Sequence, residues 1–184
     1  MLSGVVIVIL ATAVANFMPK SWYSRMETIE TYSEDNSAMG RLNAWKFAYR
    51  AANDNLFGLG FDGFRAETFM VYAPNPTHVQ GAHSIYFYVL GDHGWIGLIL
   101  FLMILFITWH KVSTVAKLTK NIEALKDYYI LSSMLKLSFI AYFVGGAFLN
   151  LSYFDLPWHL VSFVILISYF LEREKLSEEV RSEK

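Results

Sequence analysis

Long runs without a charged side chain constrain the fold of this chain more than any other feature. Such runs occupy residues 1–18, 94–109, 137–154 and 156–171. An α-helix needs about 20 mostly apolar residues to cross a bilayer, with a range of roughly 17–25. The first and third runs reach that range, the second does so if its helix begins in the aromatic stretch 85–90, and the fourth is marginal. The sequence therefore predicts an integral membrane protein.

The composition agrees with this prediction. Of the 184 residues, 55% are hydrophobic and 17% are charged, whereas soluble domains carry about 25% charged residues. We therefore expect an all-α, polytopic fold with about four transmembrane helices in this chain. The absence of cysteine excludes disulfides and thiol chemistry. The net charge of −1 does not indicate a nucleic-acid partner.

The first run has an alternative interpretation as a signal peptide. Residues 13–15, Ala-Val-Ala, resemble a cleavage site. The run lacks the basic residues with which signal peptides begin, so we predict a transmembrane helix.

Lysine and arginine in short connections predict the orientation in the membrane. Residues 111–129 contain four of them and residues 172–184 another four, whereas the connection around Asp155 contains none. Both basic segments are therefore predicted to face the cytoplasm. The predicted order is a helix at 1–18, an external segment at 19–93, a helix at 94–110, a cytoplasmic loop at 111–129, helices at 130–154 and 156–171, and a cytoplasmic tail at 172–184.

The long external segment is expected to contain short helices and to lie folded against the membrane helices. Asn36 or Ser37 can cap a helix over residues 38–53. Within that helix, one apolar stripe and one polar set are predicted from the helical spacing. The stripe contains Leu42, Trp45, Tyr49 and Ala52, and the polar set contains Asn43, Lys46 and Arg50. Glycine and proline then predict an irregular loop up to residue 83.

Two motifs in the external segment are better explained without a ligand. Residues 58–63 read Gly-Leu-Gly-Phe-Asp-Gly, which formally matches a dinucleotide-binding motif. That motif needs a strand before it, and no strand is predicted there, so we interpret it as a glycine-rich turn. The acids of the second motif have helix-like spacing but no neighbouring histidine, which favours a solvated face over a metal site. These acids are Glu27, Glu30, Glu34 and Asp35.

Three titratable residues, His83, Asp92 and His93, lie directly ahead of the second apolar run. If residues 83–93 are helical, the two histidine rings are about 15 Å apart along the helix axis. Asp92 then points to the face opposite His83, so the three groups do not form one cluster. Asp92 and His93 are expected at the water boundary. His83 suits either an interfacial histidine with one hydrogen bond or a general base.

Several motifs carry a family resemblance. They are Arg41-Leu-Asn-Ala-Trp45, Asn55-Leu-Phe-Gly-Leu-Gly60, Ala82-His-Ser-Ile-Tyr86 and Leu90-Gly-Asp-His-Gly-Trp-Ile-Gly-Leu98. In this order they resemble the C-terminal part of the O-antigen ligase and polymerase superfamily, over roughly residues 19–110. Residues 73–76 and 83–87 are most similar to the exosortase-associated O-glycosylation ligases. The chain departs from the family pattern at Leu56, Ser84 and Asp92, where proline, asparagine and glutamate are common.

Family members carry many membrane helices ahead of this region. We therefore expect the chain to correspond to the C-terminal third of such an enzyme, which leaves open whether it is active alone. The resemblance implies a glycosyltransferase of the bacterial inner membrane, with no cofactor and an active site on the periplasmic face. We expect the enzyme to be metal-independent, because the sequence shows no plausible cluster of metal ligands and arginine can stabilise the charge. Its donor would be a glycan on a polyprenyl pyrophosphate lipid, and its acceptor a hydroxyl of a lipid, glycan or protein, as in the assembly of lipopolysaccharide and other cell-envelope polysaccharides.

The implied chemistry assigns roles to particular residues. The pyrophosphate leaving group is stable as an anion, so it needs a fixed cation, and a guanidinium binds it bidentately. The attacking alcohol needs a base that titrates near neutrality. The resemblance thus implies His83 as general base and Arg41 as pyrophosphate clamp, with Arg50, Arg65 and Tyr86 as weaker substrate contacts. A polymerase of the same superfamily and a non-catalytic membrane subunit are the alternatives.

Overall fold

The computed structural model describes residue 19 and residues 36–182. The predicted helix at 1–18 and the four acids between Glu27 and Asp35 lie outside the described residues. The chain divides into two compact units, Met1–Leu42 and Asn43–Lys184, and the packing described below lies within the second.

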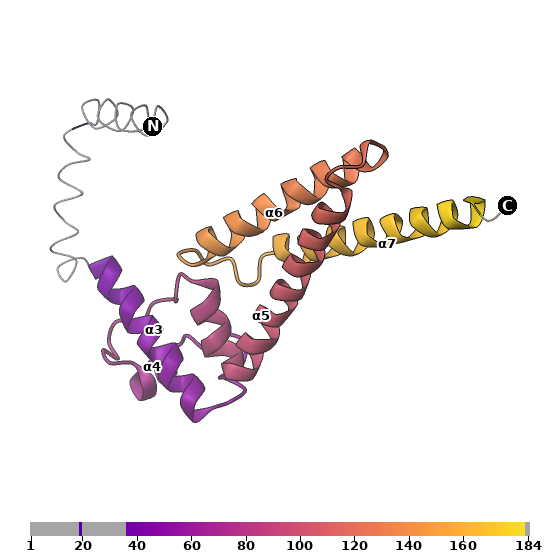
Figure 1. Cartoon of the computed structure of the whole chain (residues 1–184). Coiled ribbons are helices and arrows are strands. Elements are labelled where there is room, and N and C mark those ends of the chain that lie inside the picture. Colours follow the sequence, from indigo (N-terminus) through magenta and orange to yellow (C-terminus); the bar gives the residue numbers. More distant parts are fainter. Residues whose placement is uncertain (1–18, 20–35, 183–184) are drawn as a thin grey trace, which may run out of the picture. The chain divides into compact units, whose positions relative to one another are not determined.

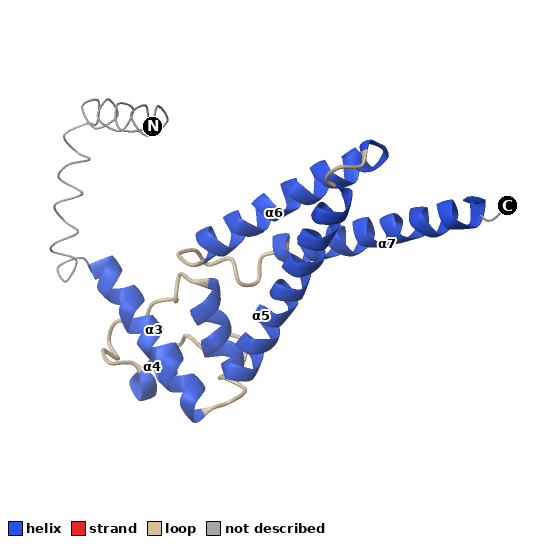
Figure 2. Ribbon diagram, viewed as in Figure 1, coloured by secondary structure: helices blue, strands red, loops and turns tan. Residues whose placement is uncertain are grey.

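The described part of the chain consists of helices joined by loops and turns and contains no strand, which confirms the predicted all-α fold (Figure 2). The elements are α3 (Asn36–Asp54), α4 (Ala66–Tyr72), α5 (Ile85–Thr119), the 3₁₀ helix η2 (Glu123–Leu125), α6 (Lys126–Gly146) and α7 (Leu156–Ser182) (Figure 1). The expected external helix at 38–53 corresponds to α3.

Three described helices are long and apolar enough to cross a membrane: Ile85–Thr119, Glu123–Gly146 and Leu156–Ser177. Their outward sides carry large exposed apolar side chains such as Ile99, Phe106 and Phe163, which water would not favour and lipid would. The chain is a membrane protein. The fourth predicted crossing, at residues 1–18, lies outside the described residues.

The helix bounds differ from those predicted, because the prediction ended each helix at the first charged residue. α5 covers residues 85–119 instead of 94–110, and with η2 and the start of α6 it leaves only residues 120–122 of the predicted loop at 111–129 outside a helix. Val112, Val115 and Thr119 are buried in this extension, which holds it in helical form despite the lysines on its outer side. α6 covers 126–146 instead of 130–154, and α7 continues beyond 171. Which side of the membrane each connection faces remains a prediction.

α5 packs against both α6 and α7, and α6 packs against α7 (Figure 1). Their shared core consists of Ile85, Val89, Phe101, Leu105, Val112, Leu135, Phe139, Tyr142, Leu160 and Val164. The end of α6 approaches the start of α5 closely, because a Cβ atom at Gly146 would lie 2.6 Å from Ile85 Cδ1. This contact places the connection from α6 to α7 beside the first turns of α5.

The buried side of α3 shares only Ala52 with the predicted apolar stripe over residues 43–54. Within residues 43–54 the buried side chains are small or aromatic: Asn43, Ala44, Phe47, Ala48, Ala51 and Ala52. Phe47 stacks on Phe69 of α4, with ring centroids 4.2 Å apart. Tyr49 of the predicted stripe is 52% exposed. Alanine permits close approach of backbones, so the small residues form the contact surface where hydrophobicity alone predicted the larger ones.

Candidate functional site

His83 occupies a strained turn immediately before α5. Its φ is +46°, a left-handed conformation that non-glycine residues seldom adopt and that persists where the surrounding structure holds it. Ser84 follows in an extended conformation at the N-cap position, and the helix begins at Ile85. His83 therefore precedes the helix and is not part of a helix over residues 83–93. The side chain of His83 is half-buried.

α3 holds this turn in place. The indole Nε1 of Trp45 donates a 2.7 Å hydrogen bond to the carbonyl of Ala82, which is fully buried. The ring of Trp45 stacks on Phe87, with centroids 4.8 Å apart and planes 8° from parallel. The backbone next to His83 is therefore fixed from one side by a hydrogen bond and from the other by the first turn of α5.

Asn43 anchors the segment that leads to the turn. Its amide nitrogen donates to the carbonyls of Asn75 at 2.9 Å and His78 at 3.1 Å, and its Oδ1 accepts from the backbone N–H of Asn75 at 2.8 Å. The sequence analysis expected Asn43 on a polar side of the helix, but the side chain is buried. It is buried because a proline-containing loop offers few internal hydrogen bonds, and Asn43 supplies the missing partners.

The glycine-rich loop at 56–60 closes on a kink in α5. Gly94 has φ +65° and ψ −167°, which interrupts the helix. The carbonyl of Gly91 instead accepts from Leu59 N–H at 3.1 Å, and the carbonyl of Asp92 accepts from Gly60 N–H at 2.8 Å. The loop thus replaces hydrogen bonds that a straight helix would make within itself. The motif is a glycine-rich turn, as predicted.

Asp92 is fully buried beneath this loop, contrary to its expected place at the water boundary. One carboxylate oxygen accepts from Gly63 N–H at 3.1 Å, and the other accepts from the hydroxyl of Tyr153 at 2.5 Å. Loop residues 56–63 fold over the kink and exclude water. The Gly63 N–H and the Tyr153 hydroxyl replace water as hydrogen-bond donors to the carboxylate. Nothing local in the sequence indicated these donors, which lie 29 and 61 positions away.

Tyr153 connects this carboxylate to the imidazole of His93. Its hydroxyl oxygen lies 3.2 Å from His93 Nε2. Burial raises the pKa of the Tyr153 hydroxyl well above its ordinary value, and the neighbouring Asp92 carboxylate raises it further. The hydroxyl therefore stays protonated and remains a donor to Asp92 at physiological pH.

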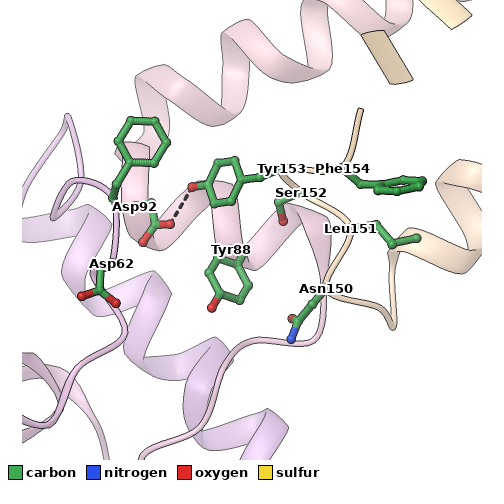
Figure 3. A pocket seen from close by; sticks show the side chains of 9 residues that line it. Asp62, Tyr88, Asp92, Asn150, Leu151, Ser152, Tyr153 and Phe154 are labelled. Carbon is green, nitrogen blue, oxygen red and sulfur yellow. Dashed lines mark hydrogen bonds between the residues drawn. The ribbon is translucent and has the colours of Figure 1, made fainter. Parts of the chain in front are cut away.

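A cavity of about 560 Å³ opens beside the Asp92–Tyr153 pair (Figure 3). Three segments that are distant in sequence form its walls: the glycine-rich loop, the start of α5 and the connection between α6 and α7. The lining residues are Phe61, Asp62, Tyr88, Asp92, Asn150, Leu151, Ser152, Tyr153 and Phe154. Sequence reasoning missed this cavity. The only signal was the presence of Asn150 and Tyr153 within a run that was otherwise apolar enough to be assigned to a helix.

The cavity borders the turn that carries His83. A Cβ atom at Gly81 would lie 3.3 Å from Tyr88 Cε2 and 3.6 Å from the amide nitrogen of Asn150. Both Tyr88 and Asn150 line the cavity. The histidine turn and the cavity are thus neighbours, because Gly81 has no side chain and its backbone lies close to Tyr88 and Asn150.

The structure places the other predicted site residues as follows. Arg41 lies on α3 one turn before Trp45, and its Nε is buried without a hydrogen bond among the described residues. Arg50 is exposed and donates to the carbonyl of Tyr72 at 3.3 Å. Arg65 is exposed at the start of α4. Tyr86 donates its hydroxyl to the carbonyl of Phe143 on α6 at 3.1 Å, so this hydroxyl already has a partner.

The cavity lining includes neither His83 nor Tyr86. Among the described residues, no group of three or more histidine, aspartate or glutamate side chains is arranged to hold a metal ion.

The chain is similar to a known protein family. A family model described as O-antigen ligase matches residues 1–102. The match includes the histidine turn, the glycine-rich loop and Asp92, and it ends within α5. Searches of curated proteins and of solved structures found no match for the chain.

Proposed function

Because the chain belongs to the O-antigen ligase family, we propose that it transfers a glycan from a polyprenyl pyrophosphate lipid to an acceptor hydroxyl at the external face of the bacterial inner membrane. The family and the apolar helices support a membrane glycosyltransferase of the ligase type. The donor, the acceptor, the membrane face and the closer relationship to exosortase-associated O-glycosylation ligases belong to the proposal.

The position of His83 is the observation that carries this proposal. A lipid-linked donor brings its reactive bond to the bilayer surface, so a base must lie where a membrane helix emerges. His83 lies directly before the membrane-spanning helix α5, half-buried, in a strained turn that Trp45 holds. A strained backbone held by its surroundings is a recurring property of functional residues. We assign His83 the role of the general base that accepts the proton of the attacking hydroxyl.

Arg41 is the proposed pyrophosphate clamp. Its Nε is buried and makes no hydrogen bond among the described residues, and a buried donor without a partner is unfavourable. A phosphate oxygen would satisfy this donor, and a guanidinium can bind phosphate through two parallel hydrogen bonds. The clamp would stabilise the negative charge that develops on the leaving pyrophosphate. Arg50, Arg65 and Tyr86 remain weaker proposed contacts, with Tyr86 the weakest because its hydroxyl is occupied.

Replacement of the two main residues should impair transfer in different ways. In membranes that contain the full-length protein, His83→Ala should lower transfer by about 10²–10⁴-fold, the usual contribution of a general base, with donor binding almost unchanged. Arg41→Ala should weaken donor binding as well as turnover, because a phosphate contact acts in both the ground state and the transition state. Arg41→Lys should restore only part of the activity, since an ammonium lacks the bidentate geometry.

His78→Ala is the matched control, because His78 lies in the same segment and is also half-buried. Within the part of the chain that the structure describes, its ring is hydrogen-bonded only to the side chain of Gln80, so transfer should stay near the wild-type level. Donor-lipid binding and single-turnover transfer are measured at equal membrane abundance. Near-normal transfer by His83→Ala would refute the assignment of the base.

A further inference from the structure

The chemical character of the cavity beside Asp92 differs from that of a phosphate site. Its lining contains the carboxylates of Asp62 and Asp92 and, among the described residues, no lysine or arginine. Two carboxylates repel a pyrophosphate group, and like charges brought together act against binding. The cavity therefore disfavours the pyrophosphate and suits a part of the substrate that carries no negative charge.

Polar groups around the cavity are available to such a ligand. The carboxylate of Asp62, the hydroxyl of Tyr88 and the amide of Asn150 all line it, and Figure 3 shows them around the same space as the Asp92–Tyr153 pair. Among the described residues, none of these three side-chain groups makes a hydrogen bond. Carboxylate and amide oxygens accept from hydroxyls, and the tyrosine hydroxyl and the amide nitrogen can donate to them.

Aromatic rings complete the walls. Phe61 is 75% exposed and Phe154 is 54% exposed, although both are large apolar side chains. Phe61 packs against Tyr153 with ring centroids 5.5 Å apart, and Tyr153 packs edge-on against Tyr88 at 6.2 Å. Aromatic rings at a bilayer surface can also form an interfacial belt. A belt accounts for exposed rings but not for two carboxylates and an amide that converge on the same space.

We propose that this cavity is a subsite for a neutral sugar ring of the glycan substrate, which stacks an apolar C–H face on Phe61 and directs its hydroxyls to Asp62, Tyr88 and Asn150. This inference rests on the proposed function. The volume of about 560 Å³ lies within the range of roughly 300–1,000 Å³ that is typical of ligand pockets. Mostly apolar walls with a few converging polar groups are the usual composition of such pockets.

The subsite has a defined relation to the proposed base. Gly81, which lies against Tyr88 and Asn150 at the cavity wall, precedes His83 by two residues. A sugar bound in the cavity would therefore lie next to the histidine turn. The Asp92–Tyr153 hydrogen bond holds Tyr153 at the cavity wall, so Tyr153 is a positioning residue.

Sugar binding can be measured without the donor lipid. The full chain in lipid nanodiscs, free of sugar-based detergents, is mixed with a panel of neutral methyl glycosides and studied by saturation-transfer difference NMR. We expect signals from the ring C–H protons of at least one glycoside. Phe61→Ala and Asn150→Ala should each weaken binding by about three- to tenfold, the usual contribution of one ring contact or one hydrogen bond.

Phe57→Ala is the matched control for Phe61→Ala. Phe57 belongs to the same loop and is equally exposed, at 76%, but does not line the cavity. Asp54→Asn is the control for Asp62→Asn, because Asp54 is also exposed and lies outside the lining. If no glycoside binds, or if Phe57→Ala weakens binding as much as Phe61→Ala, the sugar subsite is refuted.

The two proposals fail in different experiments. His83→Ala should lower transfer by about 10²–10⁴-fold and leave glycoside binding intact. Normal transfer by His83→Ala together with loss of glycoside binding in Phe61→Ala would refute the base and retain the subsite. Impaired transfer by His83→Ala together with unchanged glycoside binding in Phe61→Ala would refute the subsite alone.

The sugar could belong to the donor or to the acceptor, and the kinetics of transfer distinguish the two. Asp62→Asn should raise KM for the acceptor if the acceptor sugar binds here, and KM for the donor lipid if the donor sugar does. In either case kcat should change little, because the contact acts on binding. Unchanged KM values for both substrates would refute the proposal.

Discussion

The hydrogen bond between Tyr153 and Asp92 should control how firmly the connection between α6 and α7 is held against α5. Tyr153→Phe removes the hydroxyl and keeps the ring, so the aromatic contacts with Phe61 and Tyr88 can persist. The buried carboxylate of Asp92 would then keep only the N–H of Gly63 as a donor. The change removes this hydrogen bond together with the 3.2 Å contact of the hydroxyl with His93 Nε2, and of the two only the bond to Asp92 involves a buried carboxylate.

The size of the effect follows from the geometry. A hydrogen bond to a charged group contributes about 1.5–3 kcal/mol. Tyr153 is 49% exposed, so water can partly replace its hydroxyl, and we expect the lower end of this range, about 1.5 kcal/mol. A free-energy difference of about 1.4 kcal/mol corresponds to a tenfold change in an equilibrium constant. Opening of the connection should therefore become about ten times more frequent.

Amide hydrogen exchange measures this opening directly. In nanodiscs, peptides that cover residues 147–155 should exchange about tenfold faster in Tyr153→Phe, while peptides from the middle of α6 should not change. Tyr49→Phe is the matched control, since Tyr49 is similarly exposed, at 52%, and its hydroxyl makes no hydrogen bond among the described residues. Equal exchange rates in wild type and Tyr153→Phe would show that the bond does not hold the connection, and the argument for Tyr153 as a positioning residue would be wrong.

Three further outcomes are expected. Gly58→Ala should destabilise the fold more than Gly60→Ala. Both glycines have positive φ, which disfavours alanine by about 1–2 kcal/mol, but only at Gly58 would the new Cβ clash with the backbone carbonyl of Asp92. Equal melting temperatures of the two variants would contradict this. The pKa of Tyr153 is raised in the folded state above its ordinary value of 10.0, so its contribution to stability should be complete below pH 10 and decline as the pH rises further. The stability difference between wild type and Tyr153→Phe should therefore be constant from about pH 7 to pH 10 and shrink above pH 10. A decline that begins near pH 7 would be inconsistent with a raised pKa. A reporter that is active only outside the cytoplasm should stay silent when fused after Lys184, because basic connections face the cytoplasm; strong activity would reverse the predicted topology.

Much of the fold follows from local properties of the sequence. A run without charge is a property of neighbouring residues, and the bilayer selects helices from it whatever the rest of the chain does. The three described membrane helices and the helix at 36–54 were therefore predictable. The glycine-rich turn was predictable too, because Gly58 and Gly60 adopt positive φ, which glycine tolerates better than other residues. The place of His83 next to a membrane helix also follows from its position directly ahead of an apolar run.

Helix ends were less predictable, since a charged residue does not end a helix that has a packed side. Lys111 and Lys117 are exposed on α5 while Val112 and Val115 on the same turns are buried. The hydrophobicity of the sequence indicates that the lysines prefer water, but it does not indicate that the opposite side of the helix contacts α6 and α7. Conversely, a run without charge does not guarantee a continuous helix. α6 ends at Gly146, within an apolar run that contains Gly145, Gly146 and Asn150.

Only the tertiary structure decided the environment of Asp92 and the existence of the cavity. The sequence contained a carboxylate at position 92 and predicted water around it, because an isolated charge is most stable in water. Burial becomes possible when Tyr153 and Gly63 supply hydrogen bonds across 61 and 29 positions of chain. Asn43 is buried for the same reason, through partners 32 and 35 positions away. Whether a polar side chain meets water or a protein donor depends on which distant segments pack beside it, and local patterns carry no information about that packing.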